Sequence, residues 1–216
     1  MILYIIRHAD PDYANNTITP FGREEAMALA EWFRDIKLDR IYTSPLGRAV
    51  ETASYTAETK DIRPEILPWT QESMDYMPKY SPSCKCDYSF STDKGVYGFN
   101  DFTGTDRMET VEKMIRSSDD FFEQLGYRRE GAFYKVLKEE NDLRIAVFCH
   151  GGFGAAWIGH LLGMAPGLAF RRINLTTTSV TTFVFGNSPD GYILPRLHRL
   201  GEICHIRSAG LRINDR

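Results

Sequence analysis

The stretch Met1-Ile-Leu-Tyr-Ile-Ile-Arg-His-Ala-Asp10 decides the fold. Its five apolar residues, 2–6, form a short run that stops at Arg7 and His8. A short continuous apolar run is typical of a strand buried inside a parallel sheet. Ligands of α/β proteins bind at the carboxyl edge of such a sheet, so Arg7 and His8 stand where a functional site is expected.

A second apolar run, Arg144-Ile-Ala-Val-Phe-Cys149, also ends in a histidine, His150, which Gly151 and Gly152 follow. If both runs are parallel strands, His8 and His150 emerge at one edge of one sheet. A single histidine of this kind is as often an ordinary, partly buried side chain. Two histidines at equivalent strand ends, one beside an arginine, favour a site.

The composition is that of a globular protein with one sizeable core. The chain has 216 residues, of which 43% are hydrophobic and 25% charged. With a net charge of -3, the chain has no excess of positive charge for binding nucleic acid or an acidic membrane surface. No apolar stretch is long enough to span a bilayer. The four cysteines show neither a disulfide framework nor metal-site spacing. We expect a cytoplasmic protein without nucleic-acid or membrane partners.

The rest of the pattern predicts alternating helices and strands. Thr19 is a candidate N-cap with Pro20 at the first helical position. We expect helices over about 20–35, 43–58 and 110–140, the last broken in two at Gly126 or Gly131, and strands over 38–42, 176–185 and 192–200. The last two strands should form an antiparallel hairpin. The predicted fold class is α/β, with three α/β/α layers and a mostly parallel central sheet.

Residues 1–216 are predicted to form one domain with an aromatic-rich insert, or lid, at about 76–107. Its basic and acidic residues alternate, so it is nearly neutral. We expect some aromatic side chains in and before it to contact the leaving group of a substrate; the alternative is a satellite core. The candidates are Trp69, Tyr76, Tyr80, Tyr88, Tyr97 and Phe102.

A cluster of basic groups is expected at the sheet edge: Arg7, His8, Arg48, His150 and the backbone N–H groups after His150, that of Gly151 included. Arg48 falls in the first turn of a predicted helix, where the macrodipole disfavours a cation and favours an anion. Two guanidinium groups and a helix N-terminus suit a phosphoryl dianion. No acidic cluster suggests Mg²⁺, so we expect no metal. Two histidines at such a pocket indicate a nucleophilic histidine.

Three motifs also resemble the histidine phosphatase superfamily, which is called phosphoglycerate mutase-like as well. These are Arg7-His-Ala-Asp10, Tyr42-Thr-Ser-Pro-Leu-Gly-Arg-Ala-Val-Glu-Thr-Ala53 and Val147-Phe-Cys-His-Gly-Gly152. The resemblance covers residues 1–75 and 143–163, with Thr19-Pro-Phe-Gly22 as a further typical element.

The resemblance implies a role for each matching residue and no cofactor. His8 would attack phosphorus and form a phosphohistidine, with Arg7, Arg48 and His150 binding the phosphoryl oxygens. The other ring nitrogen of His8 should donate to a main-chain carbonyl. Glu72, at the position of the family's Leu-x-Glu element, would protonate the leaving oxygen and then activate water. Asp75 and Glu65 are the alternatives to Glu72.

We therefore expect a metal-independent phosphatase acting on a small phosphomonoester. A phosphoglycerate mutase is the alternative within the family, and a catalytically silent phospholigand-binding protein is the alternative outside catalysis. The family usually has glycine where Ala9 stands. An alanine there is strained only if the backbone needs a positive φ.

Overall fold

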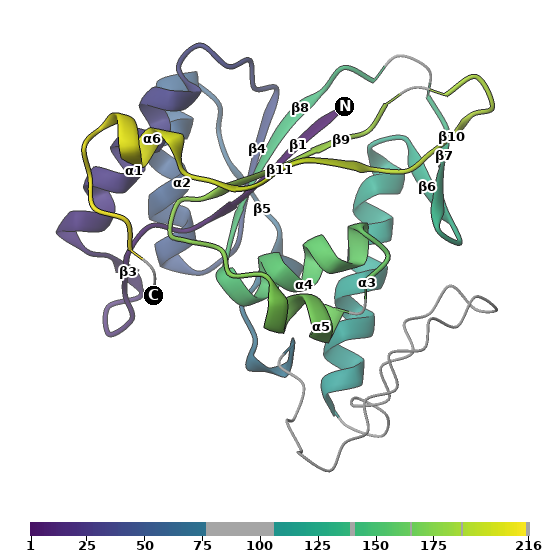
Figure 1. Cartoon of the computed structure of the whole chain (residues 1–216), viewed down its shortest axis with the longest axis horizontal. Coiled ribbons are helices and arrows are strands. Elements are labelled where there is room, and N and C mark those ends of the chain that lie inside the picture. Colours follow the sequence, from purple (N-terminus) through teal and green to yellow (C-terminus); the bar gives the residue numbers. More distant parts are fainter. Residues whose placement is uncertain (77–105, 139–140, 165, 187, 215–216) are drawn as a thin grey trace.

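A mixed six-stranded sheet lies at the centre of the fold (Figure 1). The structure is a computed structural model that describes residues 1–76, 106–138, 141–164, 166–186 and 188–214. The strands run in the order β11 (Arg196–Glu202), β9 (Val180–Val184), β1 (Ile2–Arg7), β8 (Arg144–Cys149), β4 (Arg40–Thr43) and β5 (Glu65–Ile66). Strands β1, β8, β4 and β5 are parallel, whereas β9 and β11 form an antiparallel pair at one edge. This arrangement confirms the predicted fold class.

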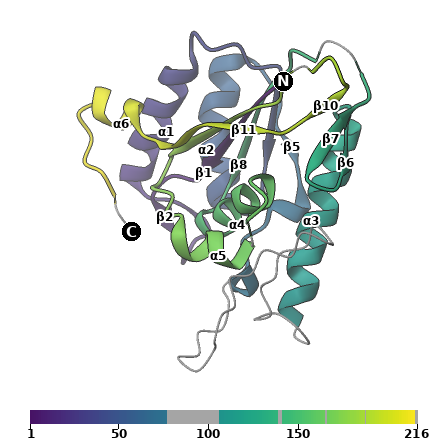
Figure 2. The same cartoon turned by 45° about the vertical axis from the view of Figure 1, so that its right-hand side comes forward.

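Helices cover both faces of the sheet (Figures 1 and 2). One side carries α1 (Pro20–Phe33), α2 (Gly47–Lys60) and the short α6 (Cys204–Ser208), and the other carries α3 (Asp106–Gln124), α4 (Gly151–Leu161) and α5 (Pro166–Arg172). Helix α1 begins as predicted, because the Thr19 side chain accepts from the Gly22 N–H at 3.0 Å and Pro20 follows it. Among the described residues, no helix has the length and apolar character needed to cross a membrane.

Successive side chains of the two central strands, β1 and β8, point alternately into two hydrophobic cores, one on each face of the sheet. In β1, Leu3 and Ile5 pack with the α3 and α4 side, whereas Tyr4 and Ile6 pack with α1 and α2. In β8, residues 145, 147 and 149 belong to the first core, and Ala146 and Phe148 to the second. Both strands are buried on both faces, which explains why their sequences read as continuous apolar runs.

The helix predicted over 110–140 ends at Gln124, shortly before Gly126, one of the two glycines expected to break it, but no second helix follows among the described residues up to 138. A hairpin follows it, formed by β6 (Tyr127–Glu130) and β7 (Phe133–Val136), with Gly131 in its turn at a φ of 65°. The predicted second helical part was wrong, because Tyr127 and Tyr134 are buried from the strands of this hairpin instead.

The strand predicted over 192–200 is divided in two. The short β10 (Tyr192–Ile193) pairs with β7 in a separate three-stranded sheet, and only β11 pairs with β9. Strand β9 also starts later than predicted, because Thr178 has a positive φ of 55° and precedes it in a turn.

Short segments frame the carboxyl edge of the sheet. These are β2 (Pro11–Asp12), β3 (Thr17–Ile18) and the 3-10 turns η1 (Pro68–Thr70) and η2 (Met74–Tyr76). Trp69 packs edge-on against Trp157 at 5.2 Å between ring centroids, and Tyr76 is buried against Phe153 at 5.9 Å. These two aromatic residues therefore contribute to the core. The other candidates, Tyr80, Tyr88, Tyr97 and Phe102, lie outside the described residues.

Candidate active site

The two histidines at the strand ends lie side by side. Arg7 pairs with Cys149 in the parallel register of β1 and β8, and the His8 N–H donates to the Cys149 carbonyl at 2.9 Å. The rings of His8 and His150 are 5.1 Å apart between centroids and tilted by 60°. Strand pairing alone thus brings together the residues that end the two apolar runs.

His8 is held in one tautomer. Its Nδ1 lies 2.7 Å from the Ala9 carbonyl oxygen. Because a carbonyl can only accept, Nδ1 carries the proton and Nε2 keeps its lone pair. Arg48 Nε lies 3.3 Å from that Nε2. Burial, together with the charges of Arg7 and Arg48, lowers the pKa of His8 to about 3, although the hydrogen bond to the Ala9 carbonyl acts to raise it. The ring is therefore neutral and nucleophilic at neutral pH.

Ala9 fits its position without strain. Among the described residues, the non-glycine residues with positive φ are Asn16, Asp61 and Thr178, so Ala9 has an ordinary backbone conformation. Its N–H donates to the Thr52 hydroxyl at 3.0 Å, and that hydroxyl donates to the Arg48 carbonyl at 2.7 Å. Thr52 thus links the backbone beside His8 to the first turn of α2.

Arg48 lies in the first turn of α2, as predicted, although this helix begins at Gly47 and not at about residue 43, and the side chain is partly buried. Burial lowers its pKa. Its guanidinium lies 5.4 Å from the centroid of the Tyr13 ring, and its Nη1 donates to Asn16 Oδ1 at 3.4 Å. The preceding Gly47 is required there, because a Cβ at that position would lie 2.1 Å from the Asn16 carbonyl oxygen.

Arg7 is the other guanidinium at this edge. It is buried, and its Nη1 donates to the Leu175 carbonyl. A Cβ on Gly151 would lie 3.3 Å from Arg7 Nε, so the glycine after His150 leaves room for the guanidinium. The two arginines and the neutral His8 therefore share one pocket edge.

Glu72 follows η1, and its carboxyl group caps the N-terminus of helix α4. Its Oε2 accepts from the Gly152 N–H at 3.0 Å and its Oε1 from the Phe153 N–H at 2.8 Å. The N–H groups predicted to bind phosphate therefore include two that bind this carboxylate. Burial raises the pKa of Glu72, although both N–H bonds and the charge of Arg48 act to lower it.

The alternative carboxylates are placed elsewhere. Asp75 accepts a hydrogen bond from the Ser73 hydroxyl at 3.0 Å, and Glu65 is exposed on β5. Of the three acidic residues considered from the sequence, Glu72 is the one that lines the cavity containing His8.

His150 lies beside His8, is fully buried, and is not among the residues that line the cavity containing His8. Its Nε2 is 2.7 Å from the Ser44 hydroxyl oxygen, and Ser44 is fully buried as well. Burial, and then the neighbouring His8, lower the pKa of His150 to about 2, so this ring is also neutral. The sequence analysis did not single out Ser44. Its position at the end of β4, a third parallel strand beside β8, was the available signal.

A cavity of about 450 Å³ opens over these groups. Sequence reasoning missed six of the residues that line it, because they come from separate loops and from α5. The cavity is lined by Arg7, His8, Tyr13, Arg48, Glu72, Met74, Gly151, Gly152, Phe170, Ile173, Asn174 and Leu175.

The comparison with known families agrees with this geometry. The family model of the histidine phosphatase superfamily (branch 1) matches residues 3–76 and 104–192. The chain belongs to this superfamily. The comparison with curated protein sequences gives no match.

Solved structures of phosphatases share the histidine phosphatase fold. A phosphoserine phosphatase from Entamoeba histolytica, in complex with 3-phosphoglyceric acid, is 22% identical with a TM-score of 0.63, over 95% of this chain and 98% of that one. A mycobacterial glucosyl-3-phosphoglycerate phosphatase is 17% identical with a TM-score of 0.58, over 93% and 98%. The alpha-ribazole phosphatase of Shigella flexneri is 17% identical with a TM-score of 0.57, over 94% and 96%. At these identities the likeness concerns the fold.

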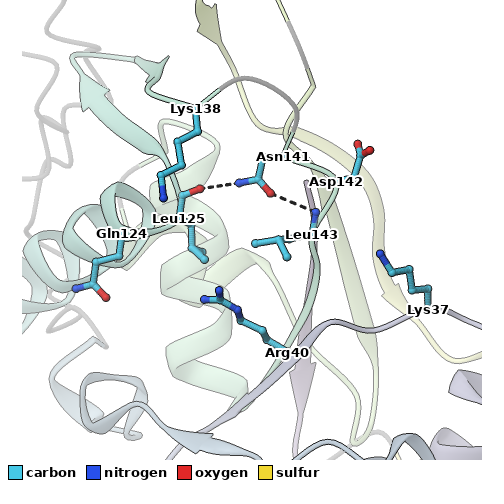
Figure 3. Close-up of a pocket in the computed structure, with 8 residues that line it drawn as sticks. All are labelled: Lys37, Arg40, Gln124, Leu125, Lys138, Asn141, Asp142 and Leu143. Atoms are coloured by element: carbon cyan, nitrogen blue, oxygen red, sulfur yellow. Dashed lines mark hydrogen bonds between the residues drawn. The ribbon is translucent and has the colours of Figure 1, made fainter.

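This histidine phosphatase superfamily member has a second hollow, of about 320 Å³, at the opposite edge of the sheet (Figure 3). There the Asn141 side chain donates to the Leu125 carbonyl and accepts from the Leu143 N–H. Lys37 pairs with Asp39 at 2.9 Å. The hollow is lined by Lys37, Arg40, Gln124, Leu125, Lys138, Asn141, Asp142 and Leu143, a set that contains no histidine.

Proposed function

We propose that this protein is a metal-independent phosphatase that hydrolyses a small phosphomonoester through a phosphohistidine on His8. The observation that carries the proposal is the 2.7 Å contact between His8 Nδ1 and the Ala9 carbonyl. It leaves on Nε2 a lone pair, which accepts from Arg48 Nε at 3.3 Å until a phosphoryl group takes that place, in a cavity that also holds two guanidinium groups and a carboxyl group with a raised pKa. These are the three kinds of group that phosphoryl transfer to a histidine needs.

In the first half of the reaction, the Nε2 lone pair of His8 attacks phosphorus opposite the leaving oxygen. The bond between phosphorus and that oxygen breaks, and Glu72 in its carboxylic acid form transfers its proton to the oxygen. Arg7 and Arg48 stabilise the charge on the phosphoryl oxygens, helped by His150 and the Gly151 N–H.

In the second half, a water molecule replaces the departed alcohol. The Glu72 carboxylate takes a proton from the water as its oxygen attacks phosphorus. The bond between phosphorus and Nε2 breaks and inorganic phosphate leaves. His8 is again neutral with its proton on Nδ1, and Glu72 is again protonated, so both groups are ready for the next turnover.

Each carboxyl oxygen of Glu72 has a second lone pair besides the one that accepts a backbone N–H. The proton can therefore occupy one oxygen while the other remains bound to α4. The raised pKa keeps a larger fraction of Glu72 protonated at neutral pH than an exposed glutamic acid would have.

Solved phosphatases with this fold support a small phosphorylated substrate, since one of them binds phosphoserine and 3-phosphoglyceric acid. The single domain over residues 1–216, the lid at about 76–107 and the cytoplasmic location stay predictions. Among the described residues, no three His, Cys, Asp or Glu side chains cluster as metal ligands.

The decisive experiment measures phosphate release from p-nitrophenyl phosphate in the presence of EDTA. We expect the wild-type protein to turn over in EDTA and His8→Ala to lose at least about 10⁴-fold in kcat. His198→Ala is the matched control, because His198 is exposed on β11, away from the cavity. Activity that survives in His8→Ala would overturn the mechanism.

Trapping the intermediate separates the alternatives. Rapid quenching into base should show one phosphorylated histidine in the wild type and none in His8→Ala. A trapped phosphohistidine that passes to a phosphoglycerate rather than to water would indicate a mutase. Phosphate binding without any phosphohistidine would indicate a binding protein.

A further inference from the structure

The cavity over His8 has two chemically different halves. Its charged lining residues, Arg7, Arg48 and Glu72, surround His8 at the strand ends. The remaining side chains come from other segments and are mainly apolar: Tyr13, Met74, Phe170, Ile173 and Leu175, with Asn174 as the one amide. We name this second group the outer wall. A phosphomonoester that reaches His8 must place its leaving group against it.

Two members of the outer wall are unusually exposed for their size. Tyr13 is 67% exposed and Met74 63% exposed. They belong to segments far apart in the sequence, the loop between β2 and β3 and the turn η2, yet both line this cavity. Large apolar side chains that gather at the rim of a cavity indicate a surface that a ligand covers.

The other members give the wall its shape. Phe170 belongs to α5 and Ile173 follows directly after it. A Cβ on Gly152 would lie 2.4 Å from the Phe170 ring, so the ring packs directly on the start of α4. Phe170 is thus held in place by contact with backbone. Tyr13, whose ring faces Arg48 at 5.4 Å, supplies a second aromatic surface.

We propose that the leaving group of the substrate is an uncharged alcohol with an aromatic or other apolar face. This inference rests on the proposed phosphatase function. The two guanidinium groups match the charge of one phosphoryl dianion, whereas a carboxylate or second phosphate in the outer half would lie against apolar side chains and lose its hydration. An apolar leaving group instead buries its carbon surface against these side chains, and the Asn174 amide can hydrogen-bond to one hydroxyl or amide of the leaving group.

The test compares leaving groups of similar intrinsic reactivity. We would measure kcat/KM for benzyl phosphate, ethyl phosphate and 3-phosphoglycerate. The wild type should prefer benzyl phosphate to ethyl phosphate by at least about tenfold, since several buried carbon atoms separate the two. It should use 3-phosphoglycerate more poorly than either. A wild type that prefers 3-phosphoglycerate would overturn the proposal.

Substitutions in the outer wall then test whether these residues cause the preference for benzyl phosphate over ethyl phosphate. Tyr13→Ala and Ile173→Ala should each lower the ratio of kcat/KM for benzyl over ethyl phosphate by about threefold or more. Phe133→Ala, which removes an exposed aromatic ring from β7 and not from the cavity, should leave the ratio unchanged. A ratio that persists in both cavity variants would also overturn the proposal.

A binding measurement distinguishes this inference from the phosphatase reaction itself. Benzylphosphonate and ethylphosphonate cannot transfer a phosphoryl group to His8 through a broken ester bond, so calorimetry reports only binding. Benzylphosphonate should bind at least about tenfold more tightly. If no phosphomonoester were hydrolysed and this difference remained, the phosphatase proposal would fail, but the proposal that the outer wall binds an apolar group would be supported. Equal dissociation constants for the two phosphonates would contradict the proposal that the outer wall binds an apolar group, even if the protein were an active phosphatase.

Discussion

The Ser44 hydroxyl oxygen lies 2.7 Å from Nε2 of His150, with both side chains fully buried. Nδ1 of His150 has no hydrogen-bond partner among the residues that the structure describes. A Ser44 hydroxyl that donates to Nε2 places the proton of the neutral ring on Nδ1, the nitrogen that we propose donates to a phosphoryl oxygen. Ser44 then acts as a positioning residue that selects the useful tautomer of His150.

Replacing Ser44 with alanine should therefore weaken catalysis without removing it. The loss of one such hydrogen bond corresponds to about 1 kcal/mol, so we expect kcat in Ser44→Ala to fall roughly fivefold to tenfold. Inhibition by inorganic phosphate should weaken as well, because His150, the donor proposed for the phosphoryl oxygens, is no longer fixed. Steady-state kinetics with phosphate as inhibitor measures both quantities.

Ser118→Ala is the matched control for Ser44→Ala. Ser118 is as deeply buried, and its hydroxyl accepts from Trp157 Nε1 at 2.8 Å, away from the cavity. Both variants should lose stability, but only Ser44→Ala should lose kcat. Equal kcat values in the two variants would contradict the positioning role.

Gly152→Ala tests the contact between helix α4 and Glu72. The new Cβ would lie 2.4 Å from the Phe170 ring and 2.9 Å from Glu72 Oε1, so the ring and the carboxyl group must move. We expect a loss of roughly 1–3 kcal/mol in the free energy of unfolding and a lower kcat. Urea unfolding and kinetics check the two effects.

The control for Gly152→Ala is Gly186→Ala. Gly186 does not have a positive φ, and a Cβ there meets nothing within 4 Å in the part of the chain that the structure describes. Its substitution should change the free energy of unfolding by less than about 0.5 kcal/mol. A Gly152→Ala variant that behaved like Gly186→Ala would show that Phe170 and Glu72 adjust freely.

The parts of the site that were predictable from sequence are those fixed by strand ends and helix starts. The apolar runs end at Arg7, His8 and His150, and the parallel pairing of the two strands places these residues at the same edge of the sheet. Arg48 lies in the first turn of α2, the helix that follows the neighbouring parallel strand β4. Glu72 was located only through the family resemblance, because the turn that carries it has no periodic pattern.

The remaining residues depend on packing between segments that the sequence does not relate to each other. Tyr13 and Phe170 meet at one cavity from a loop and from α5, and no local pattern links them. The error over 127–136 has a similar origin. Tyr127 and Tyr134 are buried by the core beneath a short hairpin, and this tertiary contact overrides the helical pattern before them.

Glu72→Gln should reveal the proton donor through the leaving group. An alkyl leaving group needs a proton as the ester bond breaks, whereas p-nitrophenolate leaves readily without one. We expect kcat/KM, which reports only the steps up to release of the alcohol, to fall about 10²- to 10⁴-fold with ethyl phosphate and much less with p-nitrophenyl phosphate. Glu65→Gln, an exposed change on β5, is the control. Equal losses of kcat/KM on both substrates would contradict the general-acid role.

The pH profile gives a second view of Glu72. Burial raises its pKa, and the donor form is lost above that pKa, so kcat/KM for ethyl phosphate should fall with rising pH in the wild type. The acid side should show no loss from protonation of His8 between pH 7 and 5, because the pKa of His8 is lowered to about 3. A wild-type profile that declines below pH 6.5 with the titration of His8 would contradict this assignment.

Buried histidines should also make the fold sensitive to acid, and His205 offers the test outside the cavity. His205 is 3% exposed, its Nε2 lies 2.9 Å from the Thr178 hydroxyl, and burial lowers its pKa to about 4. In the unfolded chain a histidine takes up its proton near pH 6.5. Between these values only the unfolded state binds the proton, so stability is present above pH 6.5 and is lost as the pH falls towards 4.

From pH 7 to pH 5 this difference lowers the free energy of unfolding by about 2 kcal/mol for His205 alone. His205→Gln keeps a polar group near Thr178 but cannot titrate. The variant should therefore lose about 2 kcal/mol less than the wild type over the same pH interval, whatever its stability at pH 7. Urea unfolding at both pH values measures the two differences. If they were equal, His205 would have to be protonated in the folded protein at pH 5, and its burial would not control its pKa.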